Sequence, residues 1–134
     1  MASGILDTNT LILLERLDPA ELPTQPMISA ITLGELSVGP LVTDEDHERA
    51  ARQARLQEVE SIFEPLPFDA AAARAFGGVA ASLRRSGRKP SARALDALIA
   101  ATAIANLLPL YTCNARDYLG IDDLDLIELR HPGA

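Results

Sequence analysis

The sequence is poor in the residues that build several common kinds of functional site. Its 134 residues contain one cysteine and two histidines, and they contain no tryptophan. The single cysteine, Cys113, cannot form an internal disulfide. Together with the scattered His47 and His131, it offers no nitrogen and sulfur ligand set for zinc. We therefore expect neither a zinc site nor a Ser-His-Asp catalytic set.

The sequence also lacks a segment that could cross a membrane or direct export. Its longest apolar stretch, residues 95–110, contains Asp96, Asn106 and Pro109 and is too short and too polar to span a bilayer. The first residues lack the basic segment and the long apolar run of a signal peptide. We expect a soluble, cytoplasmic protein without a membrane partner, and the length predicts one domain over residues 1–134.

Positive charge is scarce overall but concentrated in one segment. The formal net charge of −7 argues against a nucleic-acid partner, because phosphate binding requires cations. However, five of the twelve Lys and Arg residues lie within ten positions, at Arg84, Arg85, Arg88, Lys89 and Arg93. The local field matters more to a polyanion than the total charge. This segment could bind a substrate backbone, and a solvated helix end is an equally good explanation.

Short apolar runs alternate with stretches of helical spacing along the chain. We expect strands at residues 4–6, 27–31, 110–112 and 124–129, with a short strand near Phe68. We expect helices at residues 8–16, 32–38, 44–63, 70–85, 91–107 and 115–119, the fourth capped by Asp69 and the fifth by Ser91. Strands that are apolar on both sides predict an α/β fold, in which helices cover both faces of a parallel sheet.

Four acidic residues stand out against this framework. In parallel α/β folds, ligands bind beyond the carboxyl ends of the strands. Asp7 directly follows the first strand, Glu35 lies soon after the second, and Asp117 lies five residues after the strand at 110–112. Asp96 lies in a helix that is apolar almost all round, where a carboxylate costs several kcal/mol unless it is paired or binds a metal. We therefore expect these four carboxylates to meet at one sheet edge.

Each acid also has an ordinary structural explanation. Asp7 could cap the helix that follows it, and Asp117 could be a first-turn acid favoured by the helix dipole. Glu35 could close a capping box with Thr32. Asp96 could pair with the arginine three positions earlier or remain protonated. These explanations do not account for the shared position of the acids at one edge of the sheet.

Neighbouring carboxylates repel one another unless cations neutralise them or their pKa values rise. Hard divalent ions such as Mg²⁺ and Mn²⁺ prefer oxygen ligands. Two such ions, about 4 Å apart, can hold the attacking and leaving oxygens during hydrolysis of a phosphodiester. Two bound ions would also reduce the formal net charge of −7 to −3, which weakens the objection to a nucleic-acid substrate.

Four segments of the sequence resemble, in order, the four motifs of PIN-domain nucleases. They are residues 5–9 (Ile-Leu-Asp-Thr-Asn), 32–36 (Thr-Leu-Gly-Glu-Leu), 95–101 (Leu-Asp-Ala-Leu-Ile-Ala-Ala) and 110–117 (Leu-Tyr-Thr-Cys-Asn-Ala-Arg-Asp). The length and motif order are similar to those of the VapC toxins of bacterial toxin–antitoxin pairs. The resemblance covers residues 4 to about 129.

The resemblance implies a fold, an activity and partners. The fold would be an α/β/α sandwich with a small, mostly parallel central sheet. The activity would be that of an endoribonuclease that depends on Mg²⁺ or Mn²⁺. The chain would form a homodimer or a toxin–antitoxin hetero-oligomer with a VapB-like antitoxin, which typically places a basic side chain in the acidic pocket.

The resemblance also implies roles for individual residues. Asp7 and Asp96 would ligate the metal, while Glu35 and Asp117 would complete the catalytic site, directly or through water. The side chains that orient these groups would be those of Asn9, Thr112 and Asn114. The sequence departs from the family at Tyr118, where the family often has phenylalanine.

Two other functions are compatible with parts of the sequence. Asp7-Thr-Asn-Thr10 is similar to the nucleophile motif of haloacid-dehalogenase-type phosphatases, with Asp7 as the nucleophile. However, Asn9 removes the second acid that this mechanism uses as its general acid–base. A non-catalytic acidic domain for partner binding or signalling is the other alternative, although no acid fits a receiver-type phosphoacceptor position well.

Overall fold

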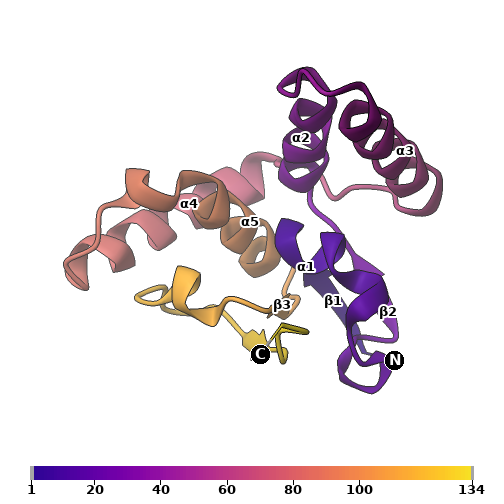
Figure 1. Ribbon diagram of the computed structural model, residues 1–134. Coiled ribbons are helices and arrows are strands. Elements are labelled where there is room, and N and C mark those ends of the chain that lie inside the picture. Colours follow the sequence, from indigo (N-terminus) through magenta and orange to yellow (C-terminus); the bar gives the residue numbers. More distant parts are fainter. Residues whose placement is uncertain (1, 134) are drawn as a thin grey trace.

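Within the described residues 2–133, four short strands form one sheet at the centre of the fold. In this computed structural model, the strands β1 (Ser3–Leu6), β2 (Gln25–Met27), β3 (Leu110–Thr112) and β4 (Leu126–Glu128) pair in the order β2-β1-β3-β4. Every pairing is parallel, which confirms the predicted sheet. Because β1 and β3 are the central strands, their carboxyl ends lie side by side at one sheet edge (Figure 1).

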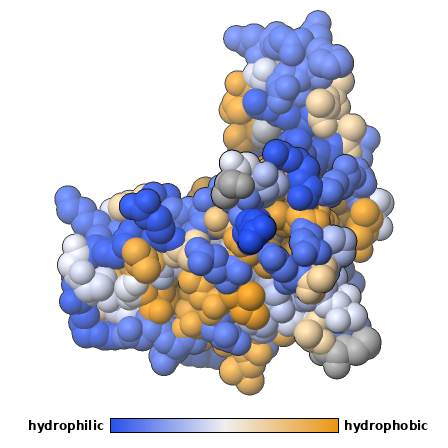
Figure 2. Space-filling view, turned by 60° about the horizontal axis from the view of Figure 1, so that its bottom comes forward, coloured by the Kyte–Doolittle hydropathy of each residue, from blue (hydrophilic) through white to orange (hydrophobic). Residues whose placement is uncertain are grey.

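Helices and short 3₁₀ turns surround this sheet. The α-helices are α1 (Thr8–Ile12), α2 (Ala30–Val38), α3 (Asp46–Ile62), α4 (Ala70–Arg85) and α5 (Ala94–Ala105). The 3₁₀ turns are η1 (Leu14–Arg16), η2 (Pro19–Glu21), η3 (Gly39–Leu41), η4 (Pro90–Arg93) and η5 (Ala115–Tyr118). In Figure 1, α2 and α3 form one pair and α4 and α5 form another, on either side of α1. The α2–α3 pair projects from the rest of the molecule as a largely hydrophilic lobe (Figure 2).

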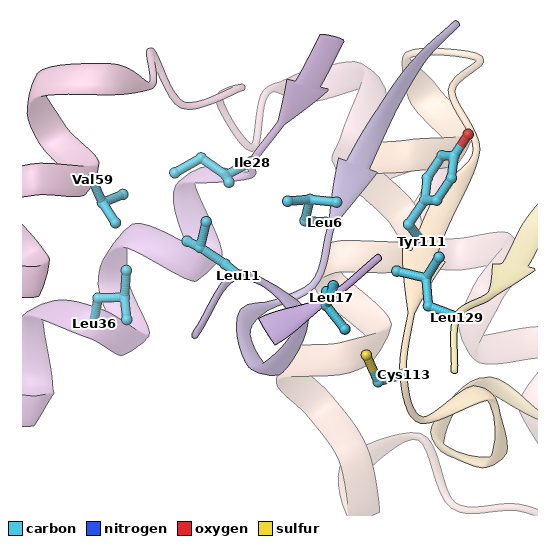
Figure 3. Packing of buried hydrophobic residues seen from close by; sticks show 9 residues of the cluster. All are labelled: Leu6, Leu11, Leu17, Ile28, Leu36, Val59, Tyr111, Cys113 and Leu129. Atoms are coloured by element: carbon cyan, nitrogen blue, oxygen red, sulfur yellow. The ribbon is translucent and has the colours of Figure 1, made fainter. Parts of the chain in front are cut away.

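Neighbouring residues of β1 pack on opposite faces of the sheet, because successive side chains of a strand point to opposite sides. Leu6 belongs to a buried cluster that includes side chains of α1, α2 and α3, among them Leu11, Leu36 and Val59 (Figure 3). Ile5 packs on the other face with Ile99 of α5. Helices therefore cover both faces, and the predicted α/β/α architecture is confirmed. No helix within residues 2–133 is both long enough and apolar enough to cross a bilayer.

The second strand and helix begin earlier than the sequence predicts. The predicted strand at 27–31 is wrong, because β2 ends at Met27 and α2 begins at Ala30. Ser29 caps α2, and its hydroxyl accepts a hydrogen bond from the Thr32 backbone N–H at 3.2 Å. The short strand expected at Phe68 is also wrong, since Ser29 forms its isolated parallel bridge with Leu66 instead.

The start of the alanine-rich helix also differs from the prediction. Ser91 is not its cap, because residues 90–93 form the 3₁₀ turn η4 and α5 begins at Ala94. The backbone of Arg93 leaves the helical conformation (φ −137, ψ 56), so the chain bends between η4 and α5. The predicted helix at 8–16 is likewise divided at Leu13 into α1 and η1. The other predicted elements occur within a few residues of their expected positions, and Asp69 caps α4 as predicted.

Candidate active site

Asp7 is the most firmly held of the four acids. It directly follows β1 and is only 4% exposed. Its Oδ1 accepts a hydrogen bond from the Thr10 backbone N–H at 3.0 Å and so caps α1, which is the ordinary structural role that the sequence also allowed. Its Oδ2 accepts hydrogen bonds from the Thr112 hydroxyl at 2.6 Å and from the Tyr118 hydroxyl at 3.0 Å. The helix cap therefore occupies one oxygen, while hydroxyl groups from β3 and η5 fix the other.

Tyr118 connects two of the acids. Its hydroxyl lies 3.0 Å from Oδ2 of Asp7 and 3.5 Å from Oδ1 of Asp96. The ring is buried, and this burial raises the pKa of the Tyr118 phenol well above its ordinary value, with the charges of Asp7 and Asp96 as further causes. The hydroxyl therefore stays protonated and donates. Sequence reasoning missed this role, although the departure from phenylalanine at this position was a signal for it.

Asp96 lies in the first turn of α5 and is partly buried. The pKa of its carboxyl rises from 3.8 to about 6, mainly because the group is buried and secondly because the charges of Asp117, Asp7 and Glu35 repel its own. Arg93 opposes this shift weakly. The charges of the other three acids thus act on Asp96, while the meeting of all four carboxylates at one sheet edge remains a prediction.

Glu35 is not held by a capping box, so that explanation is wrong. The cap of α2 is Ser29, and Thr32 lies inside the helix. Instead, Oε1 of Glu35 accepts a hydrogen bond from the Thr8 hydroxyl at 2.7 Å, and this hydroxyl also lies 3.0 Å from the hydroxyl of Thr32. Because Thr8 directly follows Asp7, this bond holds Glu35 beside the start of α1.

Asp117 lies in η5 and forms an ion pair with Arg93. Its Oδ1 is 3.1 Å from Nη1 of Arg93, and the two side chains are 22% and 52% exposed. The alternative pairing of Arg93 with Asp96 does not occur, because no such ion pair exists among residues 2–133. Arg93 thus belongs to the rim of the acidic site.

The three residues expected to orient the acids differ in how they contact the site. Thr112 donates to Asp7, and its hydroxyl accepts a hydrogen bond from the Asn114 backbone N–H at 2.9 Å. Asn9 is exposed and lines a hollow that also includes Glu35. Thr112 therefore contacts an acid directly, and Asn114 contacts Thr112 through its backbone.

The donor chemistry of this site fits a hard cation, since every candidate ligand is an oxygen. A bound cation would also offset the repulsion by Asp117, Asp7 and Glu35, which adds to the effect of burial on the pKa of Asp96. Each of the four carboxylates has a hydroxyl or arginine partner. Within residues 2–133, no three acidic, His or Cys side chains are grouped around a common ion position. The acids thus share a neighbourhood without forming a closed ligand set.

The five basic residues of the 84–93 segment have different surroundings. Arg85 forms an ion pair with Asp122 at 3.0 Å, and Arg84 is exposed at the end of α4. Arg88, Lys89 and Arg93 line a hollow beside Asp117. The predicted basic segment therefore divides into residues that border the acidic site and residues that do not.

Comparison with known proteins agrees with this geometry. The PIN domain family model matches residues 5–119. The chain is 36% identical over 131 residues to Ribonuclease VapC5 of Mycobacterium tuberculosis, covering 96% of this chain and 94% of that protein. It is 29% identical over 130 residues to Ribonuclease VapC of Rickettsia bellii, covering 92% of this chain and 93% of that protein.

Solved structures give the same result. The crystal structure of VapBC-5, a member of the VapBC family of toxin-antitoxin systems from M. tuberculosis, contains a chain that matches with a TM-score of 0.80 and 34% identity, covering 96% of this chain and 100% of that chain. The DNA-bound VapBC of Salmonella typhimurium matches with a TM-score of 0.76 and 28% identity, covering 96% and 98%. The resemblance seen in the sequence is thereby confirmed, and the chain belongs to the PIN-domain family and, within it, to the VapC ribonucleases.

Proposed function

We propose that this chain is the ribonuclease toxin of a toxin–antitoxin pair and that it hydrolyses RNA with the help of a divalent metal ion, Mg²⁺ or Mn²⁺. The observation that carries the proposal is the proximity of two acids, since the Tyr118 hydroxyl lies 3.0 Å from Oδ2 of Asp7 and 3.5 Å from Oδ1 of Asp96. In addition to burial, the charges of Asp117, Asp7 and Glu35 raise the pKa of Asp96. Repulsion between neighbouring carboxylates destabilises the folded protein, and a bound cation would remove this repulsion. Membership of the VapC ribonucleases favours this function over the phosphatase and signalling alternatives.

In this proposal, Asp7 and Asp96 hold the metal. When bound, the metal supplies Lewis acidity at the scissile phosphate. The Tyr118 and Thr112 hydroxyls keep Asp7 in one orientation, since both donate to its Oδ2. This leaves Asp7 little rotational freedom, so the site is preorganised before substrate arrives.

Glu35 and Asp117 have complementary roles in the proposed reaction. The Thr8 hydroxyl orients Glu35 at 2.7 Å, so its second carboxylate oxygen is the one available to position the attacking water. Arg93 forms an ion pair with Asp117 at 3.1 Å, which orients the Asp117 carboxylate at the rim of the site. A single PIN-like domain over residues 1–134 would carry this whole site, as its residues extend from position 7 to position 117.

The proposed partner is a VapB-like antitoxin. Structural neighbours of this chain are described as VapBC complexes, and two of them are bound to DNA. We infer that this chain assembles with such an antitoxin in a hetero-oligomer, or with itself as a homodimer in the free state. Induced expression of the chain should arrest growth, and co-expression of its antitoxin should restore it.

The metal-dependent activity can be tested with purified protein free of antitoxin. A fluorescent single-stranded RNA should be cleaved with Mg²⁺ or Mn²⁺, and EDTA should stop the reaction until metal is added again. Asp96→Asn should remove cleavage, while Asp44→Asn, at an exposed position before α3, should cleave like the wild type. Cleavage by D96N at the wild-type rate would show that Asp96 has no part in the reaction.

A further inference from the structure

A hollow of about 570 Å³ lies beside the acidic site. The end of α4, the loop that follows it, the turns η4 and η5, the start of α5 and the segment after η5 form its wall. The side chains that line it are Leu83, Arg88, Lys89, Ala92, Arg93, Ala97, Asp117 and Ile121. Its volume falls within the range of roughly 300–1,000 Å³ that is usual for small-ligand sites. Because Asp117 lies in its wall, the hollow opens directly beside the candidate active site.

The rim of this hollow carries more positive than negative charge. Arg93 is neutralised by Asp117, but no ion pair within residues 2–133 involves Arg88 or Lys89. An anionic group that enters the hollow would therefore meet two cations without ionic partners. This distinguishes them from Arg85, whose charge is paired with Asp122.

The stem of the Arg88 side chain lies close to the backbone of Gly120. Gly120 has a positive φ of 87°, and a Cβ atom there would lie 3.2 Å from Cδ of Arg88. The stem of Arg88 thus passes directly over a glycine backbone. The Arg88 backbone N–H also donates to the Leu83 carbonyl at 2.9 Å. Arg88 is half-buried as a result, unlike the exposed Arg84.

The floor of the hollow is apolar. Leu83 and Ala97 are buried at 6% and 1% exposure, and Ile121 packs against the same cluster between α4 and α5. An apolar floor beneath arginine side chains suits a nucleobase, because a base presents a flat apolar face and guanidinium groups both stack on bases and bind phosphate. A purely acidic peptide would use the cations but would gain little from the floor.

We propose that this hollow is a nucleotide subsite, which binds the base and phosphate of one RNA nucleotide next to the bond that is cut. Arg88 and Lys89 bind the phosphate, and the floor formed by Leu83, Ala97 and Ile121 receives the base. The subsite rests on the proposed ribonuclease function, because its position matters for catalysis only if RNA is the substrate. It divides the basic segment into Arg88 and Lys89, which bind substrate, and Arg84 and Arg85, which do not.

The subsite can be tested without any cleavage. ¹⁵N-labelled full-length protein is titrated with AMP, GMP, CMP and UMP in the presence of EDTA, with adenosine and inorganic phosphate as partial ligands. Backbone signals around the hollow, including those of Ala92 and Ile121, should shift, and the nucleotides should bind more tightly than either partial ligand. Arg88→Ala should weaken binding by about tenfold or more, as expected for the loss of a charge-assisted hydrogen bond.

Matched variants separate this site from general electrostatic attraction. Arg84→Ala removes the same charge from the same segment outside the hollow and should leave nucleotide affinity nearly unchanged. Ala92→Trp fills the hollow from its exposed rim and should abolish binding, whereas Ala94→Trp, at an exposed position outside the lining, should not. Equal weakening by R84A and R88A, or unchanged binding by A92W, would overturn the proposal. Binding of a hexaglutamate peptide at least as tightly as AMP would overturn it in favour of a protein ligand.

Cleavage kinetics give a second and independent measurement. In a protein that cleaves short RNA, R88A and A92W should raise KM more than they lower kcat, because the subsite holds substrate without touching the reacting atoms. If the wild type does not cleave RNA but the titration behaves as expected, the proposed function fails and the nucleotide site stands. If the wild type cleaves RNA and the titration shows no binding in the hollow, only the subsite is refuted.

Discussion

Asp96→Asn should stabilise the metal-free protein while it abolishes activity. In the folded chain, the pKa of Asp96 rises from 3.8 to about 6, mainly because the carboxyl is buried and secondly because Asp117, Asp7 and Glu35 repel its charge. A change of that size corresponds to about 3 kcal/mol of free energy at neutral pH. Since Asp96 is partly exposed, solvent screening reduces this, and we expect a gain of about 1–2 kcal/mol for the neutral asparagine.

The pH dependence of this gain has a definite sign. Unfolded Asp96 loses its proton near pH 3.8 and the folded residue near pH 6, so the folded state binds more protons between these values. The stability of the wild type therefore falls as pH rises through this window. At pH values below 3.8 the carboxyl is protonated in both states, and the advantage of the asparagine should disappear.

Thermal and urea denaturation with EDTA would measure the effect. At about pH 7.5, D96N should melt roughly 3–5 °C above the wild type, and the difference should shrink strongly at about pH 4. Asp44→Asn, which changes an exposed carboxylate, should stay within about 0.5 kcal/mol of the wild type at both values. A D96N protein less stable than the wild type at neutral pH, or a difference independent of pH, would refute this electrostatic account of Asp96.

Other substitutions probe the scaffold around the site. Tyr118→Phe keeps the buried ring but removes the hydrogen bond to Asp7, so it should lower the free energy of unfolding in urea by about 1–2 kcal/mol and slow RNA cleavage. Wild-type activity in this variant would argue against orientation of Asp7 by the hydroxyl. Gly4→Ala would bring a Cβ atom into the ring of Tyr111 and should lower the unfolding free energy by about 1–3 kcal/mol. Gly78→Ala lies in α4 with no atom near the added Cβ, so it should raise that free energy by about 0.5–1 kcal/mol, and a loss would reveal a contact that the structure lacks.

The parallel sheet and the position of Asp7 at its edge could be predicted because both depend on strong, local signals. Asp7 follows a short apolar run directly, and the carboxyl ends of adjacent parallel strands necessarily lie together. Asp96 stood out because its helix is apolar almost all round. These signals need no knowledge of side-chain packing.

The sequence prediction of where α2 begins was wrong because two nearby residues could each cap this helix. Ser29 and Thr32 are both good helix caps, and the choice between them decides whether Glu35 is part of a cap or free to bond with Thr8. The sequence favoured Thr32 because Glu35 follows it at capping-box spacing. In the structure, Ser29 forms a parallel bridge with Leu66, and α2 begins directly after it at Ala30.

Tertiary contacts account for the remaining differences. The pairing of Arg93 with Asp117 rather than Asp96 depends on the bend between η4 and α5.

The two sets of hydrogen bonds at Asp7 have a consequence for how this chain tolerates mutation over evolutionary time. Because one oxygen caps α1 and the other accepts two buried hydroxyl groups, loss of the carboxylate lowers the amount of folded protein as well as its activity. Glu35 bonds only to a partly exposed threonine. In a duplicated copy that has lost enzyme activity and is retained only because it binds a partner protein, we expect Asp7 to remain conserved long after Glu35 has been substituted.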